Sequence, residues 1–375
     1  MNDHKITALD PPVAADGGQC VKDNNNIIPD AFDDFKTQTT KYDDWGVLDS
    51  SYLKTVSMPE LYDTVFNSRL PLVDGLLYPG IYILAGSSKI GKSFMMAQLA
   101  YHVSTGTPLW NYSVRQGTVL YLALEDNYGR LQNRLYRMFG TNIADNLYLA
   151  TYANCVSGGL DKQLQRFITD HPNTKLIIID TLQKAREYSG DNYSYANDYQ
   201  FITCLKEFAD AHNICLLLVH HVRKLQAEDK FDMISGTNGL FGSADGAFIL
   251  YKEKRTSNNA TLEIAGRDQP DQKLYLVRNQ KRLIWELERS ETELWKEPPE
   301  PLLEEIAKHI NADLPQWCGT PTEFVVFLGM DIQANVLTLK LNLNAGTLYR
   351  DYGIKYESKR THGGRQVKFS YEPTP

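Results

Sequence analysis

The segment Gly86–Ser93 constrains this chain more than any other part of its sequence, because its letters GSSKIGKS fit the pattern G-x-x-x-x-G-K-[ST] in full. The two glycines of the pattern let the backbone bend so that successive N–H groups point at the α- and β-phosphates of a nucleotide. Lys92 can then reach the β- and γ-phosphates, and the Ser93 hydroxyl can coordinate Mg²⁺. Residues 81–85 predict a buried parallel strand before the loop, and residues 94–100 predict a helix after it.

This context predicts a site for a nucleoside triphosphate, since a strand, a glycine loop and a helix N-terminus together form an anion site. The alternative is a glycine turn with an incidental lysine, which the flanking strand and helix disfavour. The residues assigned to nucleotide binding are Gly86, Ser87, Ser88, Lys89, Ile90, Gly91, Lys92, Ser93 and Phe94.

Composition limits the class of protein. The chain has 375 residues, 42% of them hydrophobic, which is enough for about two domains. No apolar run approaches the roughly 18 residues of a membrane span, and the N-terminus lacks the apolar stretch of a signal peptide. The net charge of −7 gives no global sign of nucleic-acid binding. Five scattered cysteines without a C-x-x-C pair favour the reducing cytoplasm and disfavour structural zinc: Cys20, Cys155, Cys204, Cys215 and Cys318.

The sequence predicts four segments. Residues 1–50 form a flexible acidic segment, because residues 1–44 carry nine Asp against four Lys and few apolar positions. Residues 51–296 form an α/β nucleotide-binding domain, entered through a short helical stretch between about residues 52 and 77. Residues 297–301 form a proline-rich linker, and residues 302–375 form a small C-terminal domain.

Within the large domain, continuous apolar runs alternate with helical segments, which predicts a parallel sheet covered on both faces. The expected strands are 118–124, 175–179 and 214–219, and the expected helices are 128–139 and 195–211. From residue 247 the rhythm changes to hairpin-like strands that extend the same sheet in antiparallel fashion: 247–252, 260–265, 273–277 and 283–287.

Carboxylates follow two of these strands. Asp180 ends the strand before it, and in phosphate-loop enzymes such an Asp holds Mg²⁺ opposite the loop serine. The alternative is an Asp that only caps the following turn. Glu125 and Asp126 follow the neighbouring strand. We assign Glu125 as the general base that orients the attacking water, because it comes first and reaches further, and Asp126 as the cap of the following helix. The reverse assignment stays open.

His220 and His221 follow the strand at 214–219. A polar side chain at this position can sense the γ-phosphate of a bound nucleotide. Zinc binding is one alternative, but the nearby Glu228 and Asp229 lack ligand spacing. A solvated pair of strand-end histidines is the other.

Taken together, these blocks resemble the AAA-type ATPases related to the RepA replicative helicase, within the RecA/DnaB-like superfamily. The resemblance covers about residues 55–290. It is carried by the phosphate loop, Trp285 and the segments YLALEDN (121–127), KLIIIDTLQKAR (175–186), LLLVHHVRK (216–224), ISGTNGLFGSADGAFIL (234–250) and LEIAGRDQPDQKLYL (262–276).

The resemblance implies a RecA-like core, ATP hydrolysis with Mg²⁺, and a homo-oligomer, usually a hexameric ring, with ATP at subunit interfaces. It also implies that the protein is encoded on a plasmid, phage or integrative element, where such proteins are frequent. By position, Lys92 and Ser93 bind phosphate and Mg²⁺, Glu125 is the base and Asp180 the metal-side carboxylate. His221, with His220 second, is the implied γ-phosphate sensor.

One element of the family does not carry over. A ring ATPase needs a cation from the neighbouring subunit, but the expected stretch 236–244 contains no Arg. Lys252, Lys254, Arg255 and Arg267 are the available substitutes, and we choose Arg267. Its alternative is a structural arginine paired with Asp268 or Asp271.

The C-terminal domain combines helices with a basic hairpin. Thr320–Glu323 forms a capping box that predicts a helix start, and residues 302–310 and 337–349 predict two more helices. Residues 354–360 and 365–369 predict the hairpin, so the order of elements resembles a winged helix-turn-helix. A phosphate backbone is the expected partner of five hairpin cations, Lys355, Lys359, Arg360, Arg365 and Lys368. A module for protein contacts is the alternative.

The sequence therefore predicts an ATPase that acts on DNA during replication of a mobile element, as a helicase or helicase loader. Two rivals stay open. One is a nucleotide-gated DNA-binding regulator that does not unwind DNA, and the other is a kinase of the KaiC type, for which no phosphoacceptor signature is visible.

Overall fold

The computed structural model of the protein describes residues 53, 55–66, 69–186, 195–222, 242–267, 269–292, 300–361 and 364–372. The chain divides into two compact units, one of residues Asn67–Pro299 and one of residues Met1–Phe66 with Glu300–Pro375. The predicted acidic segment 1–50 and most of the predicted linker, residues 297–299, lie outside the described residues.

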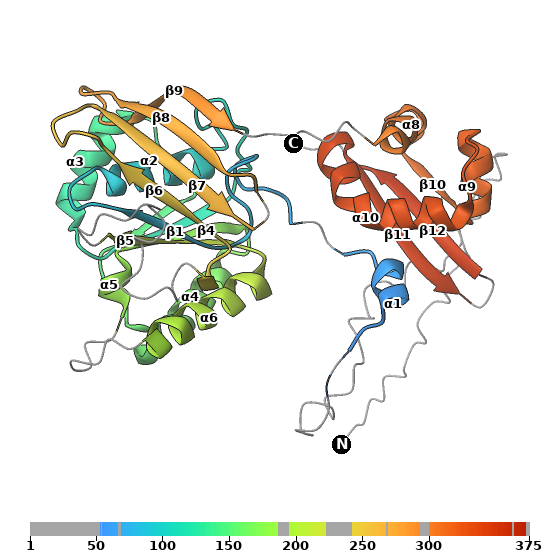
Figure 1. The fold of residues 1–375 in the computed structure, drawn as a ribbon, viewed down its shortest axis with the longest axis horizontal. Helices are drawn as coiled ribbons and strands as arrows, with labels where there is room; N and C mark the ends of the chain where they lie inside the picture. Colours follow the sequence, from blue (N-terminus) through green and yellow to red (C-terminus); the bar gives the residue numbers. More distant parts are fainter. Residues whose placement is uncertain are drawn as a thin grey trace, which may run out of the picture. The chain divides into compact units, whose positions relative to one another are not determined.

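The larger unit is built on a nine-stranded sheet in the order β3-β2-β4-β5-β1-β6-β7-β8-β9 (Figure 1). Its parallel part confirms the α/β class and places the phosphate-loop strand β1 between β5 and β6. The parallel strands are β1 (Gly80–Gly86), β2 (Thr118–Ala123), β3 (Leu147–Ala150), β4 (Thr174–Asp180), β5 (Cys215–His221) and β6 (Gly246–Tyr251). A parallel sheet whose central strand leads into a glycine loop and a helix is the α/β phosphate-loop architecture that the sequence predicts.

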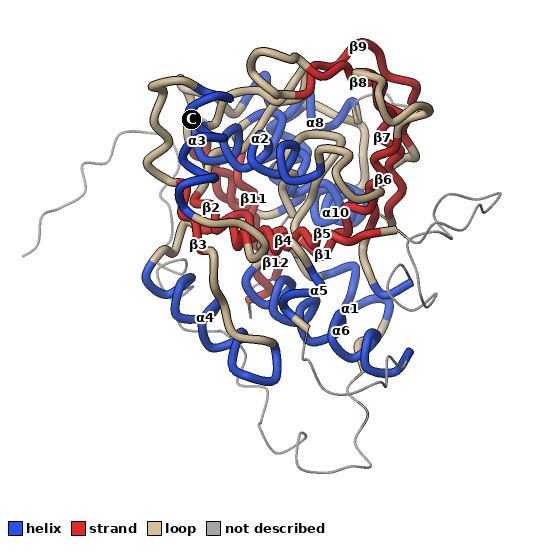
Figure 2. The backbone as a smooth tube through the Cα atoms, turned by 90° about the vertical axis from the view of Figure 1, so that its left-hand side faces the viewer, coloured by secondary structure: helices blue, strands red, loops and turns tan. Residues whose placement is uncertain are grey.

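Helices cover both faces of this sheet (Figure 2). Alternate residues of β1 point to opposite faces, so Tyr82 and Leu84 join one buried core while Ile81 and Ile83 join the other. The first core is completed by α2 (Lys92–Thr105) and α3 (Tyr128–Phe139). The second is completed by α4 (Asp161–Asp170), α5 (Leu182–Ala185) and α6 (Tyr195–His212).

The antiparallel extension is confirmed with most boundaries shifted by one or two residues, except that its last strand ends five residues later than predicted. It consists of β7 (Asn259–Gly266), β8 (Gln272–Arg278) and β9 (Trp285–Thr292), each hydrogen-bonded to its neighbour along the chain. The elements that were not predicted in this unit include the edge strand β3 and the helices α4 and α5. β3 is short and only partly buried, so its sequence lacks the continuous apolar run that marked the central strands, and α4 buries only Leu164 fully.

The smaller unit combines helices with a three-stranded sheet in the order β10-β12-β11. In its core Phe324 stacks on Phe369, and the Trp317 ring packs tilted against Phe324. The predicted capping box is present, because Thr320 Oγ1 accepts from the Glu323 amide while the Glu323 carboxylate accepts from the Thr320 amide. The elements are α1 (Met58–Asp63), α8 (Pro301–His309), β10 (Gln316–Gly319), α9 (Pro321–Leu328), α10 (Ala334–Tyr352), β11 (Ile354–Thr361) and β12 (Gly364–Tyr371).

The boundary between the units differs from the prediction. Residues 51–66 were expected to open the nucleotide-binding domain, whereas helix α1 belongs to the smaller unit. Two polar contacts hold it there: the Tyr62 carbonyl accepts from Asn342 Nδ2 at 2.7 Å, and Asp63 Oδ2 lies 2.8 Å from Arg365 Nη2. Pattern reasoning could not see them, because their partners lie about 300 residues further along the chain. In the part of the chain that the structure describes, no helix is long and apolar enough to cross a membrane.

Candidate nucleotide-binding and catalytic site

The phosphate loop joins the end of β1 to the start of α2, as the sequence predicts. Gly91 has φ +110°, a left-handed conformation that glycine adopts without strain. A Cβ at this position would also lie 2.9 Å from Trp285 Cζ2, which is closer than carbon atoms pack. A Cβ on Gly86 would lie 2.5 Å from the Leu250 carbonyl oxygen. The two glycines of the pattern are therefore required by the packing of the loop on β6 and β9 as well as by its turn.

Lys92 lies at the centre of the site. Its Nζ donates to the carbonyl oxygens of Gly86 at 2.6 Å and Ser87 at 3.0 Å, and it lies 3.0 Å from His221 Nδ1. Burial lowers the pKa of Lys92 to about 8, while the charges of Asp180 and Glu125 oppose that shift. A cation this poorly solvated gains strongly from an anionic ligand placed against it.

Asp180 ends β4 directly opposite Ser93. The Ser93 hydroxyl is hydrogen-bonded to the Asp180 carboxylate, which also accepts from Tyr121 Oη at 2.9 Å. Burial raises the pKa of Asp180, and the two hydrogen bonds oppose that shift. A hydroxyl beside a buried carboxylate is the oxygen donor set that Mg²⁺ prefers when phosphates complete its coordination. Ser93 and Asp180 therefore fit the predicted metal site.

Glu125 lies just beyond β2, exposed at the same edge of the sheet. Its Oε1 accepts from Thr181 Oγ1 at 2.9 Å, so the residue after Asp180 fixes the orientation of the Glu125 carboxylate. The prediction that Asp126 caps the following helix was wrong. Asp126 does not cap α3, because Asn127 Oδ1 accepts from the Arg130 amide at 2.9 Å and provides that cap.

Asp126 is instead engaged in ion pairs. Its carboxylate lies 2.5 Å from Arg134 Nη2 and 3.2 Å from Arg130 Nε, and its side chain is only 9% exposed. Both oxygens of this carboxylate are therefore engaged by guanidinium groups. This geometry favours Glu125 over Asp126 as the base.

His221 is placed against the loop by the register of β5, which pairs it with Gly86. Burial, followed by the charge of Lys92, lowers the pKa of His221. His220 pairs with Ala85 in the same ladder. Among the described residues, no group of three His, Cys, Asp or Glu side chains could hold a metal ion, so the zinc alternative gains no support, and Glu228 and Asp229 lie outside them.

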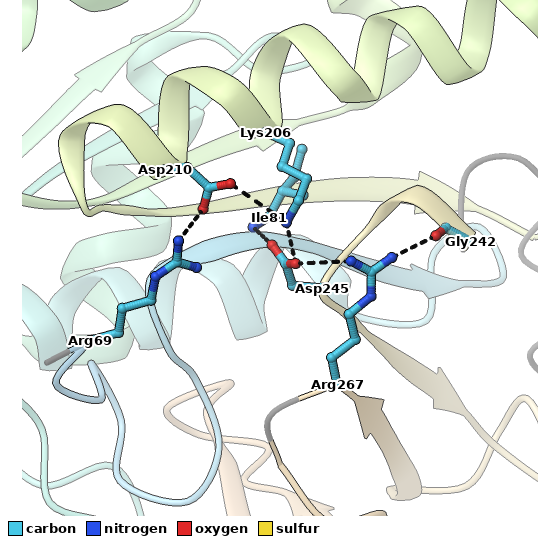
Figure 3. Close-up of polar contacts among 7 residues, drawn as sticks. All are labelled: Arg69, Ile81, Lys206, Asp210, Gly242, Asp245 and Arg267. Carbon is cyan, nitrogen blue, oxygen red and sulfur yellow. Dashed lines mark hydrogen bonds and ion pairs between the residues drawn. The ribbon is translucent and has the colours of Figure 1, made fainter. Parts of the chain in front are cut away.

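Arg267 lies at the opposite edge of the sheet from its own phosphate loop. It follows Gly266, which pairs with Gly246 at the start of β6, whereas the loop follows the far end of β1. Figure 3 shows Arg267 Nη2 donating to the Gly242 carbonyl at 3.0 Å and Nη1 3.8 Å from Asp245 Oδ1. Asp245 therefore pairs with Arg267 here, rather than the suggested Asp271; Asp268 lies outside the described residues.

Asp245 is the centre of this charged network (Figure 3). Its carboxylate contacts Lys206 and accepts from the Ile81 amide at 3.0 Å, while Asp210 binds Arg69 at 3.0 Å. A Cβ on Gly80 would lie 2.6 Å from Asp245 Oδ2, so that glycine leaves room for the buried carboxylate. The network links β1, α6 and the start of β6. The side chain of Arg267, which contacts Asp245, is 56% exposed.

Sequence reasoning missed one cation beside the loop. Arg278 ends β8 on the same edge as the phosphate loop, and its guanidinium lies 4.3 Å from the centre of the Phe94 ring. Arg134 lies over the same ring at 4.9 Å. Lys252, one of the substitutes considered for Arg267, is 5.4 Å from the Trp285 ring. The register of β6, β7 and β8 brings Arg278 and Lys252 to the loop, whereas the packing of α3 brings Arg134 there. No spacing in the sequence reveals that register.

The predicted DNA-contacting cations lie on the β11–β12 hairpin. Arg360 and Arg365 face each other across the ladder, and both approach Asp63 of α1. Lys355 lies 3.1 Å from Glu357, and Lys368 stands opposite Glu357 in the ladder. Lys359 stands opposite Gln366.

Comparison with known proteins gives a family match and several structural similarities. Residues 49–227 match the family model AAA_25, described as an AAA domain. No curated protein matches the sequence significantly.

Among solved structures, the chain is similar to the ATPase domain of another protein, with 16% identity, a TM-score of 0.46, and coverage of 56% of this chain and 84% of that one. It is similar to a DnaB-like replicative helicase solved for its interactions with primase, at 17% identity and a TM-score of 0.46, covering 56% of this chain and 58% of that one. A KaiC-like protein from the archaeon Pyrococcus horikoshii OT3 is 13% identical with a TM-score of 0.43, covering 60% of this chain and 99% of that one. At these values the similarities assign no activity to the present chain.

Proposed function

We propose that this protein binds ATP with Mg²⁺ and hydrolyses it. One observation carries the proposal: the fold brings Lys92, Ser93, Asp180, Glu125 and His221 from three neighbouring strand ends to one phosphate loop. The match of residues 49–227 to an AAA-domain family supports it.

Each side chain then has a distinct task. Lys92 neutralises the β- and γ-phosphates, and its low pKa shows how little solvent stabilises its charge before phosphate arrives. Ser93 and Asp180 hold Mg²⁺, which supplies charge stabilisation to the transferred phosphoryl group. Glu125, oriented by Thr181, accepts a proton from the attacking water. His221 lies within hydrogen-bonding distance of Lys92 Nζ, so it responds when phosphates draw the lysine away from the loop carbonyls.

The step beyond ATP hydrolysis is action on DNA. We propose that the protein is a RepA-like motor, a helicase or helicase loader in the replication of a plasmid, phage or integrative element, and that it works as a homo-oligomeric, six-membered ring. Two features support a role on DNA: the order α8, β10, α9, α10 and the β11–β12 hairpin fits a winged helix, and the hairpin carries five cations. The sequence resemblance to AAA-type ATPases related to the RepA helicase, which usually form hexameric rings, supports the ring.

A second function is supported by the same small unit. A nucleotide-gated regulator would bind duplex DNA through the hairpin and hydrolyse ATP slowly to reset its assembly. It would not separate strands.

One experiment distinguishes the two functions. The ATPase rate of the full chain is measured alone, with single-stranded DNA and with duplex DNA, next to unwinding of a forked duplex and a mass measurement with a non-hydrolysable ATP analogue. Stimulation by single strands with unwinding supports the motor. Duplex binding without stimulation or unwinding supports the regulator, and an absence of ATP hydrolysis by the folded protein contradicts both.

A further inference from the structure

Helix α1 borders a groove in the smaller unit, between the start of α10 and the tip of the β11–β12 hairpin. The groove has a volume of about 690 Å³. Its walls come from α1, the first turn of α9, the first turns of α10 and the hairpin, and include Pro59, Asp63, Thr320, Asn335, Arg360 and Arg365. An N-terminal segment therefore lines the face that a winged helix would present to DNA.

One carboxylate serves both arginines of this groove. Asp63 Oδ2 lies 2.8 Å from Arg365 Nη2 and 3.5 Å from Arg360 Nη1. Arg365 is 17% exposed and its Nη1 is buried without a hydrogen-bond partner, whereas Arg360 is 80% exposed. A single oxygen shared by two guanidinium groups is the arrangement that a phosphate oxygen adopts between arginines. Asp63 thus presents to the two arginines an anionic oxygen of the kind that a backbone phosphate would offer.

The contact that holds α1 is polar and shallow. None of its six residues is buried, Met58 and Leu61 are exposed, and the apolar contact of the segment is that of the partly buried Val65, which packs against the core of the unit just after the helix. Besides Asp63, the main contact is the Tyr62 carbonyl, which accepts from Asn342 Nδ2 at 2.7 Å. Asn342 Oδ1 accepts in turn from Tyr356 Oη at 3.2 Å, so one amide side chain links α1, α10 and β11. A segment with so little buried apolar surface separates from its unit at low free-energy cost.

We propose that α1 is a built-in competitor of the DNA phosphate backbone, and that Asp63 holds Arg360 and Arg365 until duplex DNA displaces it. The proposal rests on the DNA contact of the hairpin in the proposed function. A phosphate backbone offers the two arginines several oxygens and releases counterions when it binds, whereas Asp63 offers one exposed carboxylate. Because the chain passes from α1 into the nucleotide-binding unit at Asn67, DNA binding frees the segment that leads into that unit.

The test uses Asp63→Asn in the full chain and a fluorescently labelled, mixed-sequence duplex without nucleotide. Loss of the competing carboxylate should tighten duplex binding by about two- to tenfold at low salt, the range for one or two exposed ion pairs. The gain should shrink as salt rises, because screening weakens the Asp63 pairs in the parent protein. Asp63→Glu should bind like the parent. The matched control is Asp313→Asn, which removes one exposed charge from the same unit at a residue with no ion pair to a described residue.

A double-mutant cycle separates competition from general repulsion of DNA. In the background Arg360→Ala/Arg365→Ala, Asp63→Asn should no longer change affinity. If the gain in duplex affinity persists in that background, or if Asp313→Asn produces the same gain, the proposal that Asp63 competes with DNA is wrong. If the arginine variant weakens binding but Asp63→Asn has no effect, the competitor fails while the DNA role of the hairpin stands. If neither variant changes duplex affinity in protein with a normal unfolding transition, both the proposed competition by Asp63 and the proposed DNA contact of the hairpin are wrong.

Discussion

Lys92 Nζ lies 3.0 Å from His221 Nδ1, so the lysine of the phosphate loop and the histidine that ends β5 are in direct contact. Burial lowers the pKa of both groups, and the charge of Lys92 lowers that of His221 further. The contact is therefore a charged lysine donating to a neutral imidazole at neutral pH. A change in the position of Lys92 Nζ therefore changes the hydrogen bonding of His221.

Replacing Lys92 should abolish nucleotide binding without unfolding the protein. Lys92→Ala removes the charge assigned to the β- and γ-phosphates, and a buried cation contributes little to folding because its desolvation offsets its contacts. Binding of a fluorescent ATP analogue and thermal unfolding measure the two properties. Lys162→Ala, at an exposed position on α4, is the control. Undiminished affinity in folded Lys92→Ala would refute the assignment of the loop.

ATP affinity should fall as pH rises above about 8. The nucleotide-free Lys92 has a pKa of about 8, and bound phosphates favour its charged form, so the complex forms with proton uptake at higher pH. Apparent affinity should then fall by up to about tenfold per pH unit. Titrations between about pH 7 and about pH 9.5 test this. Lys92→Arg, whose guanidinium stays charged, should bind with little dependence on pH. Constant affinity of the parent protein over that range would contradict the low pKa.

Glu125→Gln should bind ATP with Mg²⁺ normally and hydrolyse it at least about a hundredfold more slowly, the usual scale for loss of a general base. Asp126→Asn should instead lower the free energy of unfolding by about 1–3 kcal/mol, because it breaks charged contacts with Arg130 and Arg134. Single-turnover hydrolysis and chemical denaturation separate the two effects. If the folded Asp126→Asn protein loses hydrolysis and Glu125→Gln does not, the assignment must be reversed.

Arg267 is proposed to act on the nucleotide of a neighbouring subunit, since it lies across the sheet from its own loop. Arg267→Ala should leave ATP binding nearly intact and reduce hydrolysis steeply, and mixing it with Glu125→Gln should restore part of the activity. Arg69→Ala is the control, because Arg69 pairs with Asp210 at the same edge and is similarly exposed. Absence of rescue on mixing, or full activity of Arg267→Ala, would leave Arg267 as the structural partner of Asp245.

If the β11–β12 hairpin contacts DNA phosphates, the DNA affinity of the protein should fall as the salt concentration rises. Replacing Lys359, Arg360 and Arg365 by Ala should remove up to about three phosphate contacts and flatten the slope of log affinity against log salt by roughly 0.9 per contact. ATPase activity without DNA should not change, because these residues belong to the unit that holds no part of the phosphate loop. An unchanged affinity and slope would favour the hairpin as a surface for protein contacts.

Much of the fold and of the site could be predicted from local sequence. The loop Gly86–Ser93 requires a fixed spacing of residue types, and the strands that end at Asp180 and before Glu125 are continuous apolar runs. Because parallel strands present their carboxyl ends at one edge of a sheet, side chains that follow those strands meet there without further information. The cap of α3 was misplaced by one residue, since Asp126 and Asn127 are both good caps and only the arginines of α3 decide between them.

The sequence by itself determined which residues form the phosphate loop, which carboxylates follow the central strands and that an antiparallel extension and a basic hairpin come after them. The tertiary structure decided which distant residues meet: Arg278 beside Phe94, Arg267 on Asp245, and Asp63 on Arg365. The physical reason is that local patterns depend on the dihedral preferences and solvation of neighbouring residues. These contacts depend instead on strand register and on the docking of segments that lie far apart in the chain.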